Sequence, residues 1–283
     1  MKDGIQAYNN VLDLIGNTPL IKLNRITASM EGSFYAKVEA FNPGHSSKDR
    51  IALHILENAE AKGILKPGDT IIETTSGNTG FSVAMVSILK GYQCILAVSS
   101  KSSADKIDML KTMGAQVHVC PAHVAADDPR SYYEVAKRLH EEIKGSIYIN
   151  QYFNELNIEA HYATTGPEIW EQTQGKITHL VACSGTGGTI SGTARYLKEQ
   201  NPAIEIVGLQ PQEGSQIPGI RRWPQAYLPK IFDRSRVDRV IDIAQQEAEA
   251  TMQALATQEG IFCGVSSGGA VAGALQLSAQ VEN

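Results

Sequence analysis

Short runs of apolar residues alternate along the chain with longer segments in which apolar residues recur every three or four positions. The short runs predict buried strands, because a strand that is covered on both faces is apolar throughout. These runs are residues 34–38, 70–72, 94–98, 116–119, 179–183 and 205–209. Helical spacing is clear at 51–61 and 133–143. The alternation predicts an α/β protein with largely parallel sheets that helices cover on both faces.

Loops that follow the strands are the expected location of a functional site, because open parallel sheets bind ligands beyond the carboxyl ends of their strands. The first such loop, residues 42–50, has the sequence N-P-G-H-S-S-K-D-R. Ser46 and Asp49 predict a capping box that places Lys48 in the first helical turn. The positive end of the helix dipole disfavours a charged lysine there and favours a nucleophilic amine. A solvated lysine at a helix start is the alternative.

Two further loops carry glycines and hydroxyls between a strand and a helix. Residues 73–80 have the sequence E-T-T-S-G-N-T-G, which predicts an anion cradle, with an ordinary capped turn as the alternative. Residues 184–189, S-G-T-G-G-T, precede a helix expected from Ile190 and favour a phosphate monoester. No G-K-[ST] follows, and the full set of dinucleotide glycines is missing.

Composition narrows the classes of partner. The formal net charge is −5, and no apolar run approaches the roughly 20 residues that span a bilayer, so nucleic acid and membrane are not expected partners. The four cysteines are scattered without a C-x-x-C pair, which favours a reducing cytoplasm and predicts neither a disulfide nor a metal site.

Taken in order, the motifs S-x-K-D-R, T-S-G-N-T-G, G-T-G-G-T and S-S-G resemble the fold-type II pyridoxal 5'-phosphate (PLP) enzymes of the cysteine synthase and cystathionine β-synthase family. The resemblance runs from residues 14–20 to 268–270. It implies two doubly wound open-sheet domains with the cofactor between them. The smaller, over residues 41–152, would bind the substrate carboxylate, and the larger, over 1–40 and 153–283, would bind the PLP phosphate.

The resemblance also implies roles for individual residues. Lys48 corresponds to the Schiff-base lysine and catalytic base, Asn78 to the residue that bonds the PLP 3'-oxygen, and Ser266 to the serine at the pyridine nitrogen. For Ser266, an N-cap of a helix starting near Gly268 is the alternative. The substrate-carboxylate group corresponds to Thr75, Ser76, Asn78, Thr79 and Gln151. The phosphate cup corresponds to Gly185, Thr186, Gly187, Gly188 and Thr189.

The implied reaction is a β-replacement that makes L-cysteine from O-acetylserine, or O-phosphoserine, and sulfide through an α-aminoacrylate. Cystathionine formation with homocysteine, a serine or threonine dehydratase, and a catalytically silent relative stay open. Residues 210–223 and 259–264 look closest to the cysteine synthase B branch, and the family implies a homodimer. Arg221 and Arg222 could hold a phosphorylated leaving group, with solvated arginines or pairs to acidic neighbours such as Glu213 as the alternative.

Three positions depart from the family pattern beside the active loops. His45 replaces a small residue, Ser47 an apolar one, and Thr74 a common proline. None of them removes a chemical group, so substrate preference is what these departures put in question.

Overall fold

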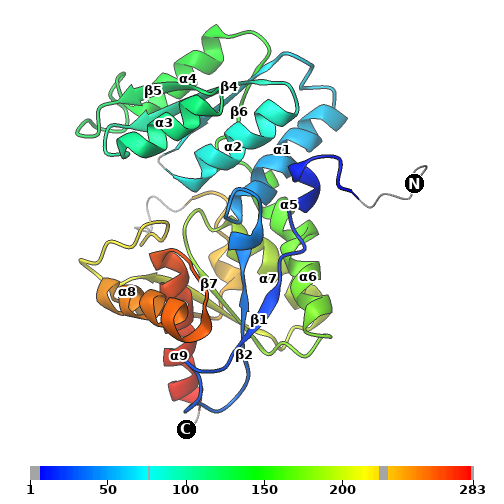
Figure 1. Cartoon of the computed structure of the whole chain (residues 1–283), viewed down its shortest axis with the longest axis vertical. Coiled ribbons are helices and arrows are strands. Elements are labelled where there is room, and N and C mark those ends of the chain that lie inside the picture. Colours follow the sequence, from blue (N-terminus) through cyan, green and yellow to red (C-terminus); the bar gives the residue numbers. More distant parts are fainter. Residues whose placement is uncertain (1–6, 76, 223–228, 282–283) are drawn as a thin grey trace. The chain divides into compact units, whose positions relative to one another are not determined.

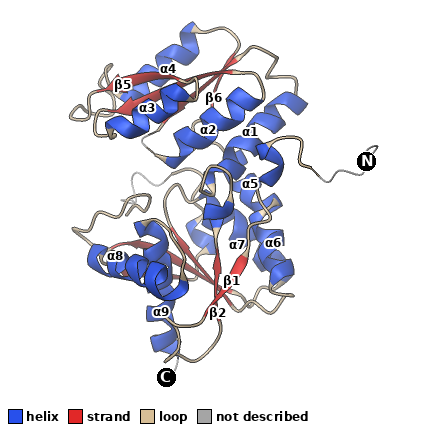
Figure 2. Ribbon diagram, viewed as in Figure 1, coloured by secondary structure: helices blue, strands red, loops and turns tan. Residues whose placement is uncertain are grey.

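The computed structural model describes residues 7–75, 77–222 and 229–281 and divides the chain into two compact units. The first unit takes residues up to 17 together with 39–151, and the second takes 18–38 together with 152 onward. Each unit combines helices with a parallel sheet (Figures 1 and 2), which confirms the predicted α/β class. The expected domain of residues 41–152 differs mainly in leaving out residues 7–17, which the structure groups with it.

The sheet of the first unit is wholly parallel and has the order β5-β4-β3-β6. Its strands are β3 (Thr70–Thr74), β4 (Gln93–Ser99), β5 (Gln116–Cys120) and β6 (Ser146–Tyr148). The first three confirm predicted strands, each slightly longer than expected, while β6 was not predicted. The chain proceeds from β3 to β4 and β5 and then returns to the other side of β3 as β6. The strand order therefore reverses between β3 and β6, which is where such sheets bind ligands.

Helices cover this sheet on both faces. They are α1 (Lys48–Ala61), α2 (Asn78–Leu89), α3 (Ala104–Thr112) and α4 (Tyr132–Glu142), with short 3-10 helices at Val11–Leu14 and Glu39–Phe41. Figure 1 shows α2 and α3 on one face and α4 on the other. Successive strand residues point to opposite faces of a sheet. On the face that α4 covers, Ile72 and Ala97 pack against Val135 and Ala136.

The second unit contains a parallel sheet of order β7-β8-β9 and a separate antiparallel pair, β1-β2. The strands are β1 (Leu20–Leu23), β2 (Phe34–Lys37), β7 (His179–Cys183), β8 (Glu205–Pro211) and β9 (Arg239–Ile243). The strand predicted at 34–38 is present as β2, but the expectation that it is buried is wrong. In the described structure β2 pairs with β1 and leaves Tyr35 52% exposed, because one face of an antiparallel ribbon can meet water.

Two hydrophobic clusters lie on the two faces of β8. Val207 and Leu209 pack in a cluster with Ala272 of α9, and Ile206 packs with Ile190 and Ala194 of α7. The helices of this unit are α5 (Leu156–Ala163), α6 (Thr165–Gln172), α7 (Gly188–Gln200), α8 (Gln245–Ala254) and α9 (Val265–Val281), with a 3-10 helix at Arg234–Arg236 and a π-helical turn at Leu255–Glu259.

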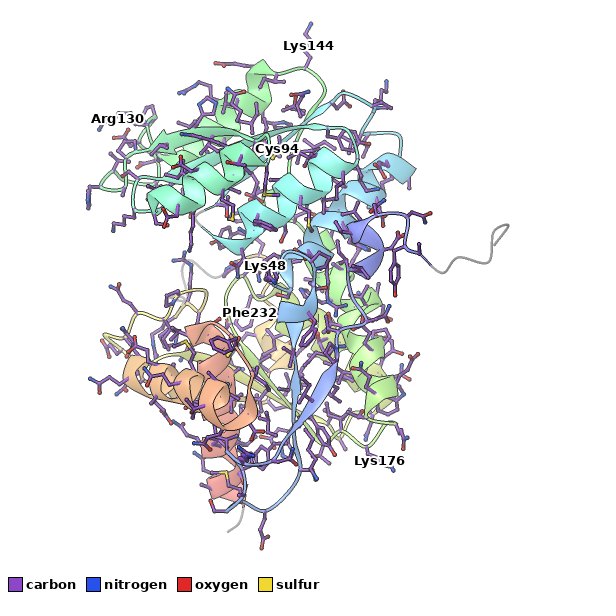
Figure 3. All side chains as sticks on the ribbon, in the orientation of Figure 1. Lys48, Cys94, Arg130, Lys144, Lys176 and Phe232 are labelled. Atoms are coloured by element: carbon purple, nitrogen blue, oxygen red, sulfur yellow. The ribbon has the colours of Figure 1, made fainter. Side chains whose placement is uncertain are left out.

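The described residues show no membrane span, metal site or disulfide. No helix within residues 7–75, 77–222 and 229–281 has the length and apolarity to cross a bilayer. The same residues contain no group of His, Cys, Asp and Glu that could hold a metal ion. All four cysteines are free, and one of them, Cys94 of β4, lies in the interior of the first unit (Figure 3).

Candidate active site

The loop before α1 places Lys48 at the first position of that helix, as predicted. The expected capping box is wrong, however. Ser46 Oγ accepts a hydrogen bond from the Lys48 N–H at 3.2 Å, but the Asp49 carboxylate accepts from the Gly44 N–H and from Ser82 Oγ, each at 2.5 Å. The Pro-Gly turn brings the backbone close to this carboxylate. A Cβ on Gly44 would lie 2.1 Å from Asp49 Oδ1.

The Lys48 amine, whose residue is labelled in Figure 3, lies in surroundings that favour its neutral form. Its Nζ donates to Ser47 Oγ at 3.2 Å. Burial lowers the pKa of Lys48, and the nearby carboxylates of Glu39 and Asp49 oppose that effect only in part. A neutral amine is the form that attacks a carbonyl carbon.

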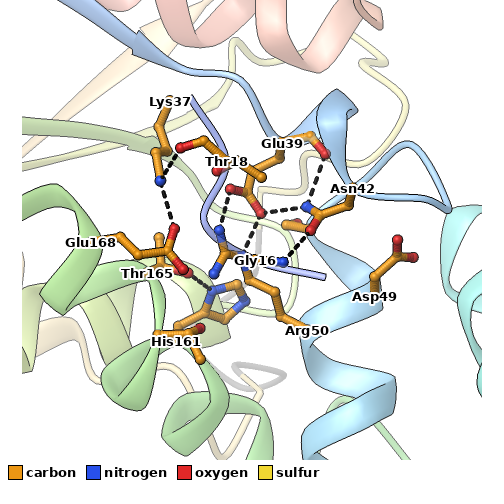
Figure 4. Close-up of polar contacts among 12 residues, drawn as sticks. Gly16, Thr18, Lys37, Glu39, Asn42, Asp49, Arg50, His161, Thr165 and Glu168 are labelled. Atoms are coloured by element: carbon orange, nitrogen blue, oxygen red, sulfur yellow. Dashed lines mark hydrogen bonds and ion pairs between the residues drawn. The ribbon is translucent and has the colours of Figure 1, made fainter. Parts of the chain in front are cut away.

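A polar network behind this loop was not anticipated from the sequence. The Arg50 side chain is 1% exposed and binds Glu39 through Nε at 2.7 Å and Nη2 at 2.8 Å. Glu39 also accepts from Asn42 Nδ2 at 3.0 Å, and Asn42 Oδ1 accepts from the Gly16 N–H at 2.8 Å (Figure 4). These bonds fix Asn42 before the Lys48 turn and Arg50 after it.

The loop after β3 curls around the side chain of Thr75. Thr75 Oγ1 accepts hydrogen bonds from the N–H groups of Gly77, at 3.2 Å, and Gly80, at 3.0 Å. A Cβ on Gly80 would lie 2.4 Å from Thr75 Cγ2, so only glycine permits this approach. Asn78 then begins α2. Ser76, which the sequence also predicts in this group, lies outside the described residues.

Gln151 joins this loop from the segment that follows β6. Thr79 Oγ1 donates to Gln151 Oε1 at 3.0 Å, although the two residues are 72 positions apart in the chain. Both side chains are buried. The reversal of strand order between β3 and β6 therefore brings Thr75, Thr79 and Gln151 to one end of the sheet.

Glu73, the residue before Thr74 at the end of β3, was not singled out in the sequence. It is fully buried, and its carboxylate accepts from the Thr74 N–H at 2.5 Å, from Thr74 Oγ1 at 3.1 Å and from the Gln151 N–H at 3.3 Å. Burial raises the pKa of Glu73 to about 7 against the opposing effect of these hydrogen bonds. No local pattern could reveal it, because the Gln151 partner lies far along the chain.

A cavity of about 180 Å³ opens beside the same loop within the first unit. Thr75, Asn78 and His45 line it together with apolar side chains of α2, β4 and α3. His45 has a φ of 59°, a left-handed conformation that non-glycine residues rarely adopt. The family departure at His45 thus lies next to the predicted substrate loop.

In the second unit, the glycine-rich loop between β7 and α7 has no space for a side chain at its glycines Gly187 and Gly188. Gly187 has a φ of 90°, and an added Cβ would lie 2.6 Å from the ring of Phe232, which Figure 3 labels. At Gly188 it would lie 2.0 Å from Asn157 Oδ1. α7 begins at Gly188, two residues before the expected Ile190. The first N–H groups of a helix lack acceptors within it, so they suit an anion.

Two side chains of α5 hold the threonines of this loop. Thr186 Oγ1 accepts from Asn157 Nδ2 at 3.2 Å. His161 is fully buried, with Nε2 3.1 Å from Thr189 Oγ1. Its Nδ1 is 2.8 Å from Thr165 Oγ1 (Figure 4). Neither residue was predicted from the sequence. Their spacing of four, which places them on one face of a helix, was the available signal.

Ser266 lies in the first turn of α9, which begins at Val265, so the N-cap alternative for Ser266 is wrong. The ideal Cβ position of Gly219 is 3.8 Å from Ser266 Oγ. That of Gly185 is 2.7 Å from the carbonyl oxygen of Gly219. Gly219 therefore lies close to both the glycine-rich loop and Ser266.

The two arginines after Gly219 differ in their contacts. The Arg221 N–H donates to the Ser184 carbonyl at 2.8 Å, which ties this stretch to the glycine-rich loop. The Arg222 guanidinium pairs with Asp242 and donates through Nε to the Pro211 carbonyl at 2.9 Å. The acidic partner of Arg222 is thus Asp242 and not Glu213. Trp223 lies outside the described residues.

The chain is similar to known proteins over nearly its whole length. A family model described as "Pyridoxal-phosphate dependent enzyme" matches residues 11–283. Cysteine synthase B of Pseudomonas aeruginosa is 51% identical over 98% of this chain and 91% of its own. Cystathionine beta-synthase of Oryctolagus cuniculus is 41% identical over 96% of this chain, which spans 52% of that relative. The crystal structure of a hydrogen sulfide-producing enzyme from Fusobacterium nucleatum superposes with a TM-score of 0.91 at 33% identity, covering 98% of this chain and 93% of that one.

Proposed function

Because this chain belongs to the pyridoxal-phosphate-dependent enzyme family, we propose that it makes L-cysteine by replacing the β-substituent of O-acetyl-L-serine, or of O-phospho-L-serine, with sulfide. The observation that carries this proposal is the 51% identity to Cysteine synthase B of Pseudomonas aeruginosa over 98% of the chain. The loops that the motifs predicted are present around Lys48 and Thr75 in the first unit and around Gly187 in the second.

PLP is the cofactor of this family, and the residues present fit it. The glycine-rich loop leaves no room for side chains at Gly187 and Gly188 and offers the N-terminus of α7 to a phosphate. Lys48 would bind the aldehyde carbon, Asn78 the 3'-oxygen and Ser266 the pyridine nitrogen. The phosphate would be held by Gly185, Thr186, Gly187, Gly188 and Thr189. When bound, PLP supplies an electron sink at the substrate α-carbon.

The chain's own groups would then direct the chemistry. The lowered pKa of Lys48 keeps more of its amine neutral, so Nζ can accept the α-proton as a general base. Ser266 carries no charge, and it does not favour a protonated ring nitrogen as a carboxylate would. That choice favours β-elimination over racemisation and transamination. The substrate carboxylate would be bound by Thr75, Ser76, Asn78, Thr79 and Gln151.

Arg221 and Arg222 are the candidate residues for holding a phosphorylated leaving group. A guanidinium matches a phosphate through two hydrogen bonds. Since Asp242 and the Pro211 carbonyl already engage Arg222, a phosphorylated donor would have to compete with that ion pair. Arg221, whose backbone N–H is bound to the Ser184 carbonyl, stays a candidate for the contact with O-phosphoserine beside Arg222.

The proposal also covers the roles of the two units, the cellular compartment, the oligomeric state and the partners. The first unit, with its Thr75–Thr79 loop and Gln151, would be the substrate-carboxylate domain, and the second would be the PLP-phosphate domain. The protein would work in the cytoplasm as a homodimer on small molecules, without nucleic acid or membrane partners. The net charge of −5 supports the absence of nucleic acid and anionic membrane as partners, the scattered cysteines support the compartment, and the homodimer follows from the family resemblance.

The test is a product assay on the PLP-loaded enzyme. It is offered O-acetylserine with sulfide, O-phosphoserine with sulfide, and serine with homocysteine, and the products are identified by chromatography. We expect L-cysteine, with kcat/KM for O-acetylserine and sulfide at least about tenfold above that for cystathionine formation, a difference of roughly 1.4 kcal/mol in activation free energy. Faster formation of cystathionine, or pyruvate as the main product, would contradict the proposal.

A further inference from the structure

We infer that Glu73 is a positioning residue for the substrate carboxylate, because its side chain joins the loop that follows β3 to Gln151. The inference rests on the proposed function, in which Thr75, Thr79 and Gln151 bind that carboxylate. Glu73 itself would not touch the substrate. It would act by fixing the two segments that do.

The first argument is where the backbone pairing between β3 and β6 ends. Their register runs from Thr70↔Ser146 to Ile72↔Tyr148, and the Ile149 N–H then donates to the Ile72 carbonyl at 3.0 Å. Beyond that bond the strands offer each other no further ladder partner in the described structure. The Gln151 N–H donates instead to Glu73 Oε2 at 3.3 Å. The carboxylate therefore continues the connection that the ladder no longer provides.

The second argument is that the same carboxylate also holds the other segment. Glu73 Oε1 accepts from the N–H of Thr74 at 2.5 Å and from its hydroxyl at 3.1 Å. Thr74 Oγ1 is 3.2 Å from the hydroxyl of Tyr148, the last residue of β6. Glu73 is fully buried, so these donors stand in for the water that would otherwise solvate its charge.

A feature of this particular chain strengthens the connection. Thr74 supplies the carboxylate with two donors, its N–H and its hydroxyl. A proline at this position would have neither. Hydrogen bonds to an ionised acceptor are the stronger class, so the link is expected to be tighter here than in a chain with proline.

The connection reaches the proposed ligands through Gln151. Its backbone N–H is bound by Glu73, and its side-chain oxygen accepts from Thr79 Oγ1 at 3.0 Å. Releasing the backbone of Gln151 would let that amide move relative to Thr79. The substrate carboxylate would then lose binding in the ground state and in the transition state alike.

The test uses Glu73→Gln, which keeps the shape and removes the charge, in the PLP-loaded enzyme. We expect KM for O-acetylserine to rise about tenfold with kcat within about threefold of wild type, because a loss of equal binding in both states changes KM alone. Thr74→Pro keeps Glu73 but removes both Thr74 donors, and it should shift KM in the same direction by a smaller factor. Thr74→Ser, which keeps both donors, is the control and should leave KM unchanged.

A second readout is independent of turnover. Amide hydrogen exchange should become faster in Glu73→Gln both in residues 77–80 and in residues 149–151, while Thr74→Ser stays at the wild-type rate. Faster exchange in only one of the two segments, or an unchanged KM with a reduced kcat, would overturn the inference. If wild-type protein makes no cysteine, the proposed function fails, and the exchange experiment still decides whether Glu73 links the segments.

Discussion

Burial acts on several ionisable side chains of the first unit in the direction of their neutral forms, and three of them lie in or beside the candidate loops. It lowers the pKa of Lys48 and raises the pKa values of Asp49 and Glu73. Lys48 and Glu73 belong to the two loops that carry the candidate chemistry, whereas Asp49 is bound to Gly44 and Ser82 and supports the Lys48 turn. A buried lysine with a lowered pKa and a buried carboxyl group with a raised pKa in such loops are typical of functional sites.

Replacing Lys48 tests the central assignment. Lys48→Ala removes both the covalent attachment point and the base, so turnover should fall by at least about three orders of magnitude, in line with the contribution of a general base. Binding of PLP should weaken but persist through the glycine-rich loop. The measurement is cysteine formation together with borohydride reduction and peptide mapping. Lys62→Ala, at the exposed end of the same helix, should behave as wild type. Label on any other lysine would contradict the assignment.

Glu73 also predicts how stability depends on pH. Its pKa of about 7 in the folded protein exceeds the ordinary value of 4.5, so between these pH values the folded state binds more protons than the unfolded state. The contribution to stability is then greatest below pH 4.5 and is lost as pH rises through 7, by about 3 kcal/mol. Urea unfolding of wild type and Glu73→Gln across pH 4.5–8 should show that difference. Parallel curves for the two proteins would contradict it.

Residues with local signals could be found from the sequence, and residues with distant partners could not. Lys48 stands in a short motif before a helix, and Gly187 stands in a run of glycines, so each could be singled out from its neighbours. Glu73 depends on Gln151, 78 positions away. His161 looks like any polar residue of a helix until the fold places Thr189 next to it.

The secondary-structure elements position the site chiefly by where they begin. α1 begins at Lys48 and α7 at Gly188, so in each case the candidate residue and the helix N-terminus coincide. β7, the strand before α7, was predictable because every residue after His179 in it is apolar. β6 was not, since its three residues are too few to show a pattern. α9 begins at Val265, ahead of the two glycines that suggested a later start.

The beginning of α7 gives a prediction that separates backbone strain from lack of space. Gly187 and Gly214 both have left-handed φ values, 90° and 82°, but only Gly187 has a neighbour within reach of an added Cβ. Gly214→Ala should lower the free energy of unfolding by about 1–2 kcal/mol. Gly187→Ala adds the clash with Phe232, and should lower it by about 3 kcal/mol or more.

The PLP affinity of the same two variants distinguishes the roles of their loops. Gly187→Ala should bind PLP at least about tenfold more weakly, a loss of roughly 1.4 kcal/mol, while Gly214→Ala should bind it as wild type does. Urea unfolding of the apoproteins and titration with PLP are the measurements. Equal effects of the two substitutions would mean that Gly187 is an ordinary turn glycine.

At the scale of the whole chain, two units each contribute a set of loops at the carboxyl ends of a parallel sheet. The α/β class followed from the alternation of strands and helices, and it is confirmed in both units. The grouping of residues 7–17 with the first unit was not expected. That grouping is carried by contacts such as the Gly16 N–H to Asn42 Oδ1, and a side-chain bond across 26 positions leaves no periodic trace in the sequence.

The order β5-β4-β3-β6 has a consequence for synthesis of the chain on the ribosome. β3 is the first strand of its sheet to emerge, but the partner for one of its two edges, β6, is the last. That edge stays unpaired until residues 146–148 have left the exit tunnel, and an unpaired strand edge is a template for pairing with another chain. The apolar run of β3 is thus exposed to aggregation for most of the unit's translation. A chain that stalls before residue 146 would leave this edge of β3 unpaired and Thr79 without its partner Gln151.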